Sequence, residues 1–502
     1  MQTSQFSQSL EGWQALANRI TFPSQAFIDG QFVDAASGET FDSVNPATGE
    51  VLVSVAACDV QDVDRAVAAA RAAFERGSWS RIAPSERKKV LLRLSQLILE
   101  HREELAVLES LDMGKLVHDA VTLDVPTSAE VFQWYAEAID KVYDEVAPLG
   151  SGALATIRRE AVGVVGAVVP WNFPLKMAAW KCAPALAAGN SVILKPAEQS
   201  PLSALKLAEL AAKAGVPAGV FNVLPGFGTT AGRAIGMHKD IDCVAFTGST
   251  EVGKMFMGYS ATSNMKQVWL ECGGKSPLLV FDDCTDIRVA AKAAAQGIFF
   301  NQGEVCSATS RVLVQRSVKS QFIEALLEAA SAYQPGNPLD PASKMGAMVD
   351  EEQTKRVLRY IELAKRDNRL LLGGDRYAEI GKGCFLTPTI FDDVKPTDTL
   401  AREEVFGPVL GVMEFDSEDE AIRVANDSIY GLGASVWTGN LKRAHRVAGR
   451  LHAGTVSVNA VDQVSVMTPF GGFKQSGIGR DLSLHALDKY TALKTTWFDL
   501  ND

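Results

Sequence analysis

Four apolar segments between residues 162 and 249 alternate with segments of helical periodicity, and this alternation restricts the possible folds more than any other feature. The segments are VGVVGAVV (162–169), SVILKP (191–196), VFNVLPG (220–226) and CVAFTGS (243–249). Because none alternates polar and apolar positions, each is expected to be a strand buried on both faces. Repeated strand–helix units predict an α/β fold with a parallel sheet, an architecture that often binds nucleotides.

The other segments suggest two or three domains, which a chain of 502 residues can form. Residues 60–145 show helical periodicity, and residues 273–478 form a second alternation of strands and helices. The segment 146–161 is predicted to be a glycine-turned hairpin, and the C-terminal YTALKTTWFDL an apolar strand. Because a protruding strand pair needs a cover, we expect a homo-oligomer.

Composition excludes several classes of partner. The formal charge of −11 argues against nucleic acid and anionic membranes. The first residues lack the basic and apolar regions of a secretory leader, and no apolar run reaches the roughly 18 residues of a membrane span, so we expect a cytoplasmic protein. Seven cysteines without a CxxC pair indicate reduced thiols. Six histidines without HExxH or similar spacing indicate no metal.

Two glycine-containing segments could bind the phosphates of a dinucleotide. GFGTTAG (226–232) has GxGxxxG spacing, one residue longer than the usual motif, and could equally be a plain strand-to-helix turn. In FTGSTEVG (246–253), Gly248 and Ser249 stand where a helix is predicted to begin. Free backbone N–H groups and the positive end of the helix dipole suit pyrophosphate there, although Ser249 could be a simple N-cap.

ILKPAE (193–198) places Lys195 and Glu198 after another strand, at the sheet edge where open α/β folds bind ligands. The Glu198 carboxylate could accept hydrogen bonds from ribose hydroxyls and would repel a 2′-phosphate, which favours NAD over NADP. The alternative is a surface ion pair with no role in binding.

The segment FFNQGEVCS (299–307) presents Cys306 after a polar turn. A buried structural cysteine normally lies within apolar sequence, whereas Asn301, Gln302 and Glu304 precede this one. An accessible thiolate is a strong nucleophile. We therefore interpret the turn as bringing Cys306 out of a helix and into a cleft, against the alternative of a buried, inert thiol.

Two other strand ends supply groups that such a nucleophile needs. VVPWNFPL (168–175) presents Asn172 between two prolines, and its amide is a neutral donor suited to an oxyanion. VWLECGGKSP (268–277) places Glu271 before two glycines, as a candidate base. Each has a structural alternative, a turn asparagine or a solvated glutamate, so the prediction depends on their combination with Cys306.

Seven motifs, in order, resemble those of the NAD(P)-dependent aldehyde dehydrogenase superfamily, from about residue 25 to 500. They are WNFP, KPAE, FTGST, ECGGKSP, FFNQGEVC, EEVFGPV (403–409) and PFGGFKQSGIGRD (469–481). The resemblance implies the aldehyde dehydrogenase fold with a Rossmann-like NAD-binding domain, a catalytic domain and an arm of β-strands for oligomerisation. The corresponding ranges are 1–145 with 162–272, 273–478, and 146–161 with 479–502.

The resemblance also implies roles for individual residues. Cys306 matches the nucleophile that forms a thiohemiacetal and then a thioester, Asn172 the oxyanion donor, and Glu271 the base that activates water. Lys181 could belong to a proton path. The implied contacts with NAD are Val169, Trp171, Lys195, Glu198, Gly228, Phe246, Gly248, Ser249, Glu404 and Phe406.

Within the superfamily, WYAEAIDKVYDEVAP (134–148) and NDSIYGLGASVWT (426–438) look most similar to dehydrogenases of polyamine breakdown, which oxidise gamma-glutamyl-aminobutyraldehyde or amino- and guanidino-aldehydes. A cationic or amide-bearing tail would be held by charge and cation–π contact. The candidate residues are Asp124, Phe173, Trp180, Asp462 and Phe470. The alternative is a general apolar tunnel for many aldehydes. The loop VNAVDQVSVMTPFGG and Cys272, beside the candidate base, depart from the pattern of the subgroup.

Three other functions remain possible from the residues alone. A related enzyme would pass the acyl group to coenzyme A, but Glu271 favours hydrolysis. A thiol esterase would need only the cysteine, asparagine and glutamate. A non-catalytic NAD-binding relative would have lost the nucleophile or the oxyanion donor, and both are present. We therefore expect a small aldehyde as substrate and a dimer or tetramer.

Overall fold

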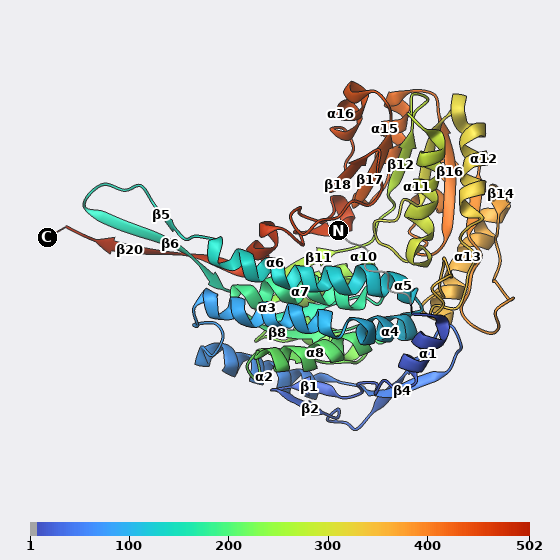
Figure 1. The fold of residues 1–502 in the computed structure, drawn as a ribbon. Coiled ribbons are helices and arrows are strands. Elements are labelled where there is room, and N and C mark those ends of the chain that lie inside the picture. Colours follow the sequence, from blue (N-terminus) through green and yellow to red (C-terminus); the bar gives the residue numbers. More distant parts are fainter. Residues whose placement is uncertain (1–7, 502) are drawn as a thin grey trace.

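The computed structural model describes residues 8–501. Two α/β lobes lie against each other, and a narrow arm of strands projects from the first lobe with the C-terminus at its tip (Figure 1). The predicted ranges also contain residues 1–7 and Asp502, which lie outside the described residues. No helix within residues 8–501 is both long enough and apolar enough to cross a membrane.

The first lobe contains a mixed sheet with the strand order β19-β11-β10-β7-β8-β9-β1-β2. Its strands are β1 (Ala26–Ile28), β2 (Gln31–Val33), β7 (Val164–Val168), β8 (Ser191–Lys195), β9 (Phe221–Val223), β10 (Cys243–Thr247), β11 (Gln267–Glu271) and β19 (Gly477–Ile478). The pairs between β7, β8, β9, β10 and β11 are parallel. This confirms the parallel strands expected from the apolar segments.

Antiparallel pairs at both edges of this sheet were not predicted. β1 pairs with β2 and β9, and β19 pairs with β11, in antiparallel register. β1 and β2 have three residues each, too few to show an alternating pattern. A separate antiparallel pair is formed by β3 (Thr40–Val44) and β4 (Val51–Ala56). These pairings depend on neighbouring strands rather than on local sequence.

Helices cover both faces of the first sheet. They are α1 (Leu10–Ala17), α2 (Val60–Arg76), α3 (Pro84–Glu100), α4 (Arg102–Met113), α5 (Val117–Asp119), α6 (Val125–Ala138), α7 (Pro174–Ala188), α8 (Leu202–Ala214), α9 (Arg233–Met237) and α10 (Thr250–Thr262). In β8, Val192 and Leu194 belong to the core cluster that includes α7 and α8, whereas Ile193 packs with α2. Alternate residues of one strand therefore enter two cores, which explains its unbroken apolar sequence.

The second lobe contains a sheet with the strand order β14-β15-β16-β13-β12-β17-β18. Its strands are β12 (Pro277–Val280), β13 (Arg311–Gln315), β14 (Arg369–Leu372), β15 (Thr389–Asp392), β16 (Val409–Phe415), β17 (Gly433–Trp437) and β18 (Thr455–Val458). Its helices are α11 (Ile287–Phe299), α12 (Lys319–Ala330), α13 (Glu351–Asp367), α14 (Thr399–Arg402), α15 (Glu418–Asn426) and α16 (Leu441–Ala448). Only the β14–β15 pair of this sheet, among the described strands, is antiparallel.

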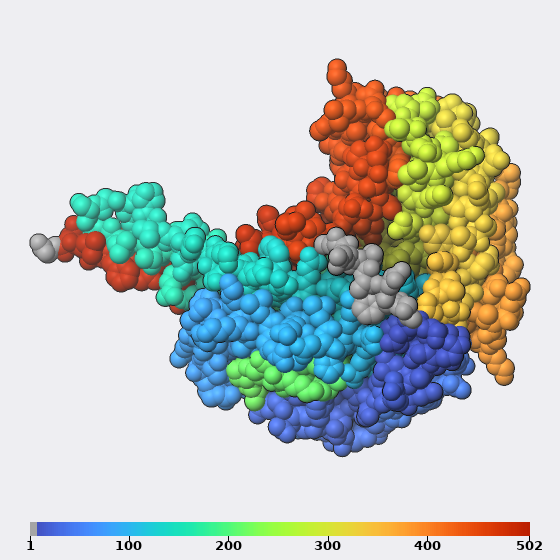
Figure 2. Space-filling model, viewed as in Figure 1, coloured from blue at the N-terminus to red at the C-terminus, as the bar shows by residue number. Residues whose placement is uncertain are grey.

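The arm consists of β5 (Glu145–Val146), β6 (Ala153–Ala161) and β20 (Thr491–Asp499). β20 pairs antiparallel with β6 along its whole length, so the C-terminal strand lies beside a strand from the first third of the chain. Figure 2 shows the arm standing clear of both lobes. Tyr490, just before β20, is fully buried, and its carbonyl oxygen accepts a hydrogen bond from Asn190. The residues before β20 therefore pack on the first lobe rather than in the arm.

Candidate active site

A cavity of about 550 Å³ lies between the two lobes, within the usual size range of small-molecule sites. It is lined by α6 and α7, by the ends of β10 and β11, by the segment around Cys306 and by the loop 461–466. The predicted residues that it brings together are Trp171, Asn172, Phe173, Trp180, Gly248, Ser249, Glu271, Cys306, Glu404, Phe406, Asp462 and Phe470. Residues up to 300 positions apart in sequence thus share one space.

The turn before Cys306 brings the thiol into the cavity, as the sequence predicted, although the polar residues of the turn are themselves buried. α11 ends at Phe299, and Asn301 and Gln302 then adopt left-handed backbone conformations with φ of 48° and 57°. The Gln302 amide donates to the Ala347 carbonyl at 3.0 Å, and its oxygen accepts from Gly346. Hydrogen bonds from these polar side chains stabilise the turn at which the chain changes direction. Cys306 follows it, partly exposed in the cavity.

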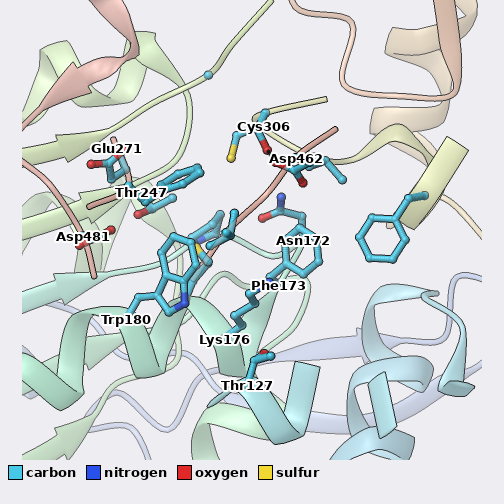
Figure 3. Close-up of a pocket in the computed structure, with 18 of the residues that line it drawn as sticks. Thr127, Asn172, Phe173, Lys176, Trp180, Thr247, Glu271, Cys306, Asp462 and Asp481 are labelled. Carbon is cyan, nitrogen blue, oxygen red and sulfur yellow. Dashed lines mark hydrogen bonds between the residues drawn. The ribbon is translucent and has the colours of Figure 1, made fainter. Parts of the chain in front are cut away.

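Asn172 lies beside Cys306 and is held by the same turn (Figure 3). Its side-chain nitrogen donates to the Glu304 carbonyl at 2.8 Å, and Asn301 donates to the Asn172 carbonyl at 3.1 Å. A primary amide has two N–H donors, so one remains for a ligand. Asn172 is therefore fixed by one hydrogen bond while it can donate another into the cavity.

Burial controls the protonation of Cys306 and Glu271. Burial raises the pKa of the Cys306 thiol, and the nearby carboxylates of Asp462, Glu404 and Glu271 raise it further. Burial also raises the pKa of Glu271 well above its ordinary value, with the charge of Asp481 as the next cause. Cys306 is thus a protonated thiol, and Glu271 is a carboxylate with increased affinity for a proton. This pair suits transfer of a proton from Cys306 to Glu271.

Asp481, whose charge acts on Glu271, is bound by two buried lysines. One carboxylate oxygen of Asp481 accepts from Lys181 at 2.5 Å, and the other accepts from Lys489. Asp481 lines the cavity, but Lys181 does not. Asp481 ends the motif PFGGFKQSGIGRD, which could have identified it, whereas nothing in the sequence singled out Lys489.

Part of the cavity wall is aromatic. The Trp180 and Phe470 rings meet edge-on at 5.1 Å, and Phe173 stacks on Phe300 at 6.2 Å. Asp462, with φ of 48°, lies beside the nucleophile because its carboxylate accepts a hydrogen bond from the Ser307 hydroxyl at 2.6 Å. The cavity therefore has an apolar wall and a carboxylate near Cys306.

The structure corrects the prediction for Asp124, which does not line the cavity. Its side chain is buried, and a carboxylate oxygen lies 2.5 Å from the Lys115 ammonium. Leu123 and Thr127 on the same stretch of helix do face the cavity. Helical geometry thus turns Asp124 away, and its charge is already paired.

Cys272 packs its sulfur into the wall of the cavity. A Cβ on Gly253 would lie 2.8 Å from that sulfur, which belongs to the buried cluster that contains Phe246. Burial raises the pKa of Cys272 to about 12. A glycine is required at 253 to make room, and the thiol remains protonated at neutral pH.

The part of the cavity nearest α10 has donors and acceptors that fit NAD. Gly248 and Ser249 line it at the start of α10, and the buried Thr247 hydroxyl has no hydrogen-bond partner. A Glu404 carboxylate oxygen accepts from the Gly274 N–H at 2.9 Å, and burial raises the pKa of Glu404 to about 7. A helix start suits pyrophosphate and a carboxylate suits ribose hydroxyls.

The remaining predicted NAD contacts lie outside this cavity, around the ends of neighbouring strands. They are Val169, Lys195, Glu198, Gly228 and Phe246. Lys195 is buried and lies 3.5 Å from the Glu198 carboxylate, and Gly228 faces open space. The Phe246 ring is buried beneath Gly248, so it supports that glycine. Trp171 and Phe406 meet edge-on at 5.2 Å in the cavity wall.

Comparison with known proteins shows similarity over almost the whole chain. A family model described as "Aldehyde dehydrogenase family" matches residues 32–496. The NADP/NAD-dependent aldehyde dehydrogenase PuuC of Escherichia coli is 52% identical, over 97% of this chain and 98% of that protein. An aminoacetaldehyde dehydrogenase of Pseudomonas aeruginosa is 50% identical, over 98% and 99%.

A solved structure is also similar over almost the whole chain. The gamma-glutamyl-gamma-aminobutyraldehyde dehydrogenase of Burkholderia cenocepacia is 56% identical and superimposes with a TM-score of 0.97, over 98% of this chain and 100% of that one. Both the sequence and the arrangement of the two lobes are therefore shared with these proteins.

Proposed function

This chain belongs to the aldehyde dehydrogenase family, and on that premise we propose that it oxidises an amino- or gamma-glutamylamino-aldehyde of polyamine breakdown to the carboxylic acid. Oxidation of an aldehyde with NAD is the activity of the family, and the names of similar proteins support this substrate class. The observation that carries the proposal is the meeting of Cys306, Asn172 and Glu271 on one cavity.

In the first step, the Cys306 sulfur adds to the aldehyde carbon, and the thiol proton passes to Glu271. The resulting thiohemiacetal oxyanion accepts hydrogen bonds from the free Asn172 N–H and from the Cys306 backbone N–H. This oxyanion makes loss of hydride from carbon favourable. NAD, when bound, accepts that hydride. Cys306 then carries the acyl group as a thioester.

Glu271 must then release the thiol proton to solvent, because only the carboxylate form can act again as a base. In the second step, Glu271 takes a proton from water, and the oxygen attacks the thioester carbon. The carbon–sulfur bond breaks, the carboxylic acid leaves, and Cys306 regains its proton. Lys181, expected on a proton path, is held by Asp481 and places a positive charge near the base. Overall, aldehyde, NAD and water give acid, NADH and a proton.

The test is a comparison of kcat/KM with NAD for gamma-glutamylamino-, amino-, guanidino-, aliphatic and aromatic aldehydes. We expect the highest values for the first two classes. A preference for simple aliphatic or aromatic aldehydes would contradict the substrate proposal. Absence of NADH formation with all of them would instead favour a thiol esterase, and product formation only with coenzyme A would exclude hydrolysis.

Asn172→Ala is expected to lower kcat/KM by about 100- to 1,000-fold, the usual cost of losing one oxyanion donor. Affinity for NAD should change little, because the amide points at Glu304 and the cavity beside Cys306. Steady-state kinetics and calorimetric NAD binding measure the two effects. A loss smaller than about tenfold would remove Asn172 from the proposed mechanism.

The arm supports the proposal of a homo-oligomer. Leu493 and Trp497 on β20 are 65% and 64% exposed, although both are large and apolar. β20 is also an edge strand of its sheet, with unpaired backbone groups along one side. A second copy of the chain would cover both features, in a dimer or a tetramer.

A further inference from the structure

Lys176 places an unpaired positive charge in the wall of the substrate cavity. It lies on α7, three residues after Phe173 and four before Trp180, so the three side chains share one face of the helix. Within residues 8–501, the Lys176 ammonium has no hydrogen bond or ion pair. Its ammonium is 5.1 Å from the Phe173 ring centroid and 5.8 Å from that of Trp180.

This charge changes the expectation that the aromatic wall binds a cationic tail. The ring of Phe173 also has the Lys115 ammonium 4.3 Å from its centroid. Two of the three aromatic rings predicted for a cation are therefore already in contact with cations of the protein. A further ammonium group would meet like charge there.

Carboxylates surround the Cys306 end of the cavity, whereas the part lined by α6 and α7 carries both Lys176 and Glu130. The carboxylates that act on the Cys306 thiol are those of Asp462, Glu404 and Glu271. In the view of Figure 3, Lys176 lies beyond Phe173 as seen from Cys306, on the side where Thr127 is drawn. A substrate with a carboxylate at the end remote from its aldehyde would thus be repelled from the Cys306 end and attracted to the Lys176 end.

We propose that Lys176 is a specificity-determining residue that binds a carboxylate at the distal end of the aldehyde substrate. This inference rests on the proposed function, and of its two substrate classes it favours the gamma-glutamylamino-aldehydes. A gamma-glutamylamino tail ends in a carboxylate and an ammonium group, whereas an amino tail ends in an ammonium group alone. Glu130, exposed on α6 one turn after Thr127, also lines the cavity and can accept the ammonium group.

The experiment uses full-length Lys176→Met and Lys176→Glu, with Lys176→Arg as the variant that keeps the charge. Lys213→Met, on α8 outside the cavity, controls for loss of a surface lysine. The substrates are butanal, 4-aminobutanal, succinate semialdehyde and gamma-glutamylaminobutyraldehyde. Values of kcat/KM are expressed relative to butanal for each variant, so that general damage to the enzyme cancels.

In Lys176→Met, the relative kcat/KM of both carboxylated aldehydes should fall about tenfold, mainly through KM, as loss of a charge-assisted hydrogen bond implies. The relative value for 4-aminobutanal should rise, and Lys176→Glu should enlarge both changes. Lys176→Arg and Lys213→Met should keep the wild-type ratios. High salt should reduce the preference of the wild type for the carboxylated aldehydes.

Equal changes for all four aldehydes would mean that Lys176 only packs against the aromatic rings, and would overturn the proposal. Unchanged ratios in Lys176→Glu would do the same. Either result would leave the proposed dehydrogenase function intact, provided that the wild type reduces NAD with butanal. A wild type that oxidises none of the four would instead overturn the proposed function.

Discussion

Cys306→Ser is expected to lower kcat/KM by at least about 1,000-fold, because a serine hydroxyl is far less nucleophilic than a thiol and lacks a base strong enough to ionise it. NAD binding should be nearly unchanged, since the predicted contacts with NAD come from other residues. Steady-state kinetics and calorimetric NAD binding measure these two results. The substitution is nearly isosteric, so folding should be preserved.

Cys284→Ser is the matched control. Cys284 is the other partly exposed cysteine of the described residues, and it lies outside the cavity. Its replacement should leave kcat/KM close to that of the wild type. If Cys306→Ser kept most of its activity, or if Cys284→Ser lost it, Cys306 would not be the nucleophile.

Glu271→Gln is expected to lower steady-state kcat by about 100- to 10,000-fold, the usual contribution of a general base. Deacylation should slow more than hydride transfer, because water is a weaker acid than a thiol and therefore depends more on the base. Rapid mixing with NAD and aldehyde should then show a burst of NADH followed by slow turnover. Slow NADH formation without a burst would show that Glu271 acts mainly before hydride transfer.

The pH dependence of deacylation follows from the raised pKa of Glu271. The protonated carboxyl cannot accept a proton from water, so deacylation should slow as the pH falls through a pKa above the ordinary value of 4.5. At higher pH the carboxylate form predominates and the rate levels off. In Glu271→Gln this acid limb should be absent, and an identical limb in both proteins would assign it to another group.

Most of the fold was predictable because local patterns specify it. The apolar segments of β7, β8, β9 and β10 required burial on both faces, and the structure confirms a parallel arrangement for them. β19 was not predictable, since its two residues pair with β11 only after the chain has crossed from the second lobe. Such short strands have no local signal of their own.

The candidate site was predictable only in part. Strand ends and glycines correctly suggested that the segments of Cys306, Asn172 and Glu271 would meet. The prediction for Asp124 was wrong, because an acidic residue near a cavity can equally face a buried lysine. The turn does bring Cys306 into the cavity, but the sequence could not show that Asn301 and Gln302 are buried and hold the backbone by hydrogen bonds.

The sequence by itself determined the family, the parallel sheets and the types of residue available for catalysis, because strand periodicity and ordered motifs are properties of the chain. The tertiary structure alone decided which charges share a space. Asp481 pairs with Lys181, 300 positions away in the chain, and Lys176 on α7 lines the same cavity as Asp462. Electrostatic interactions depend on distance and burial, and only folding sets both.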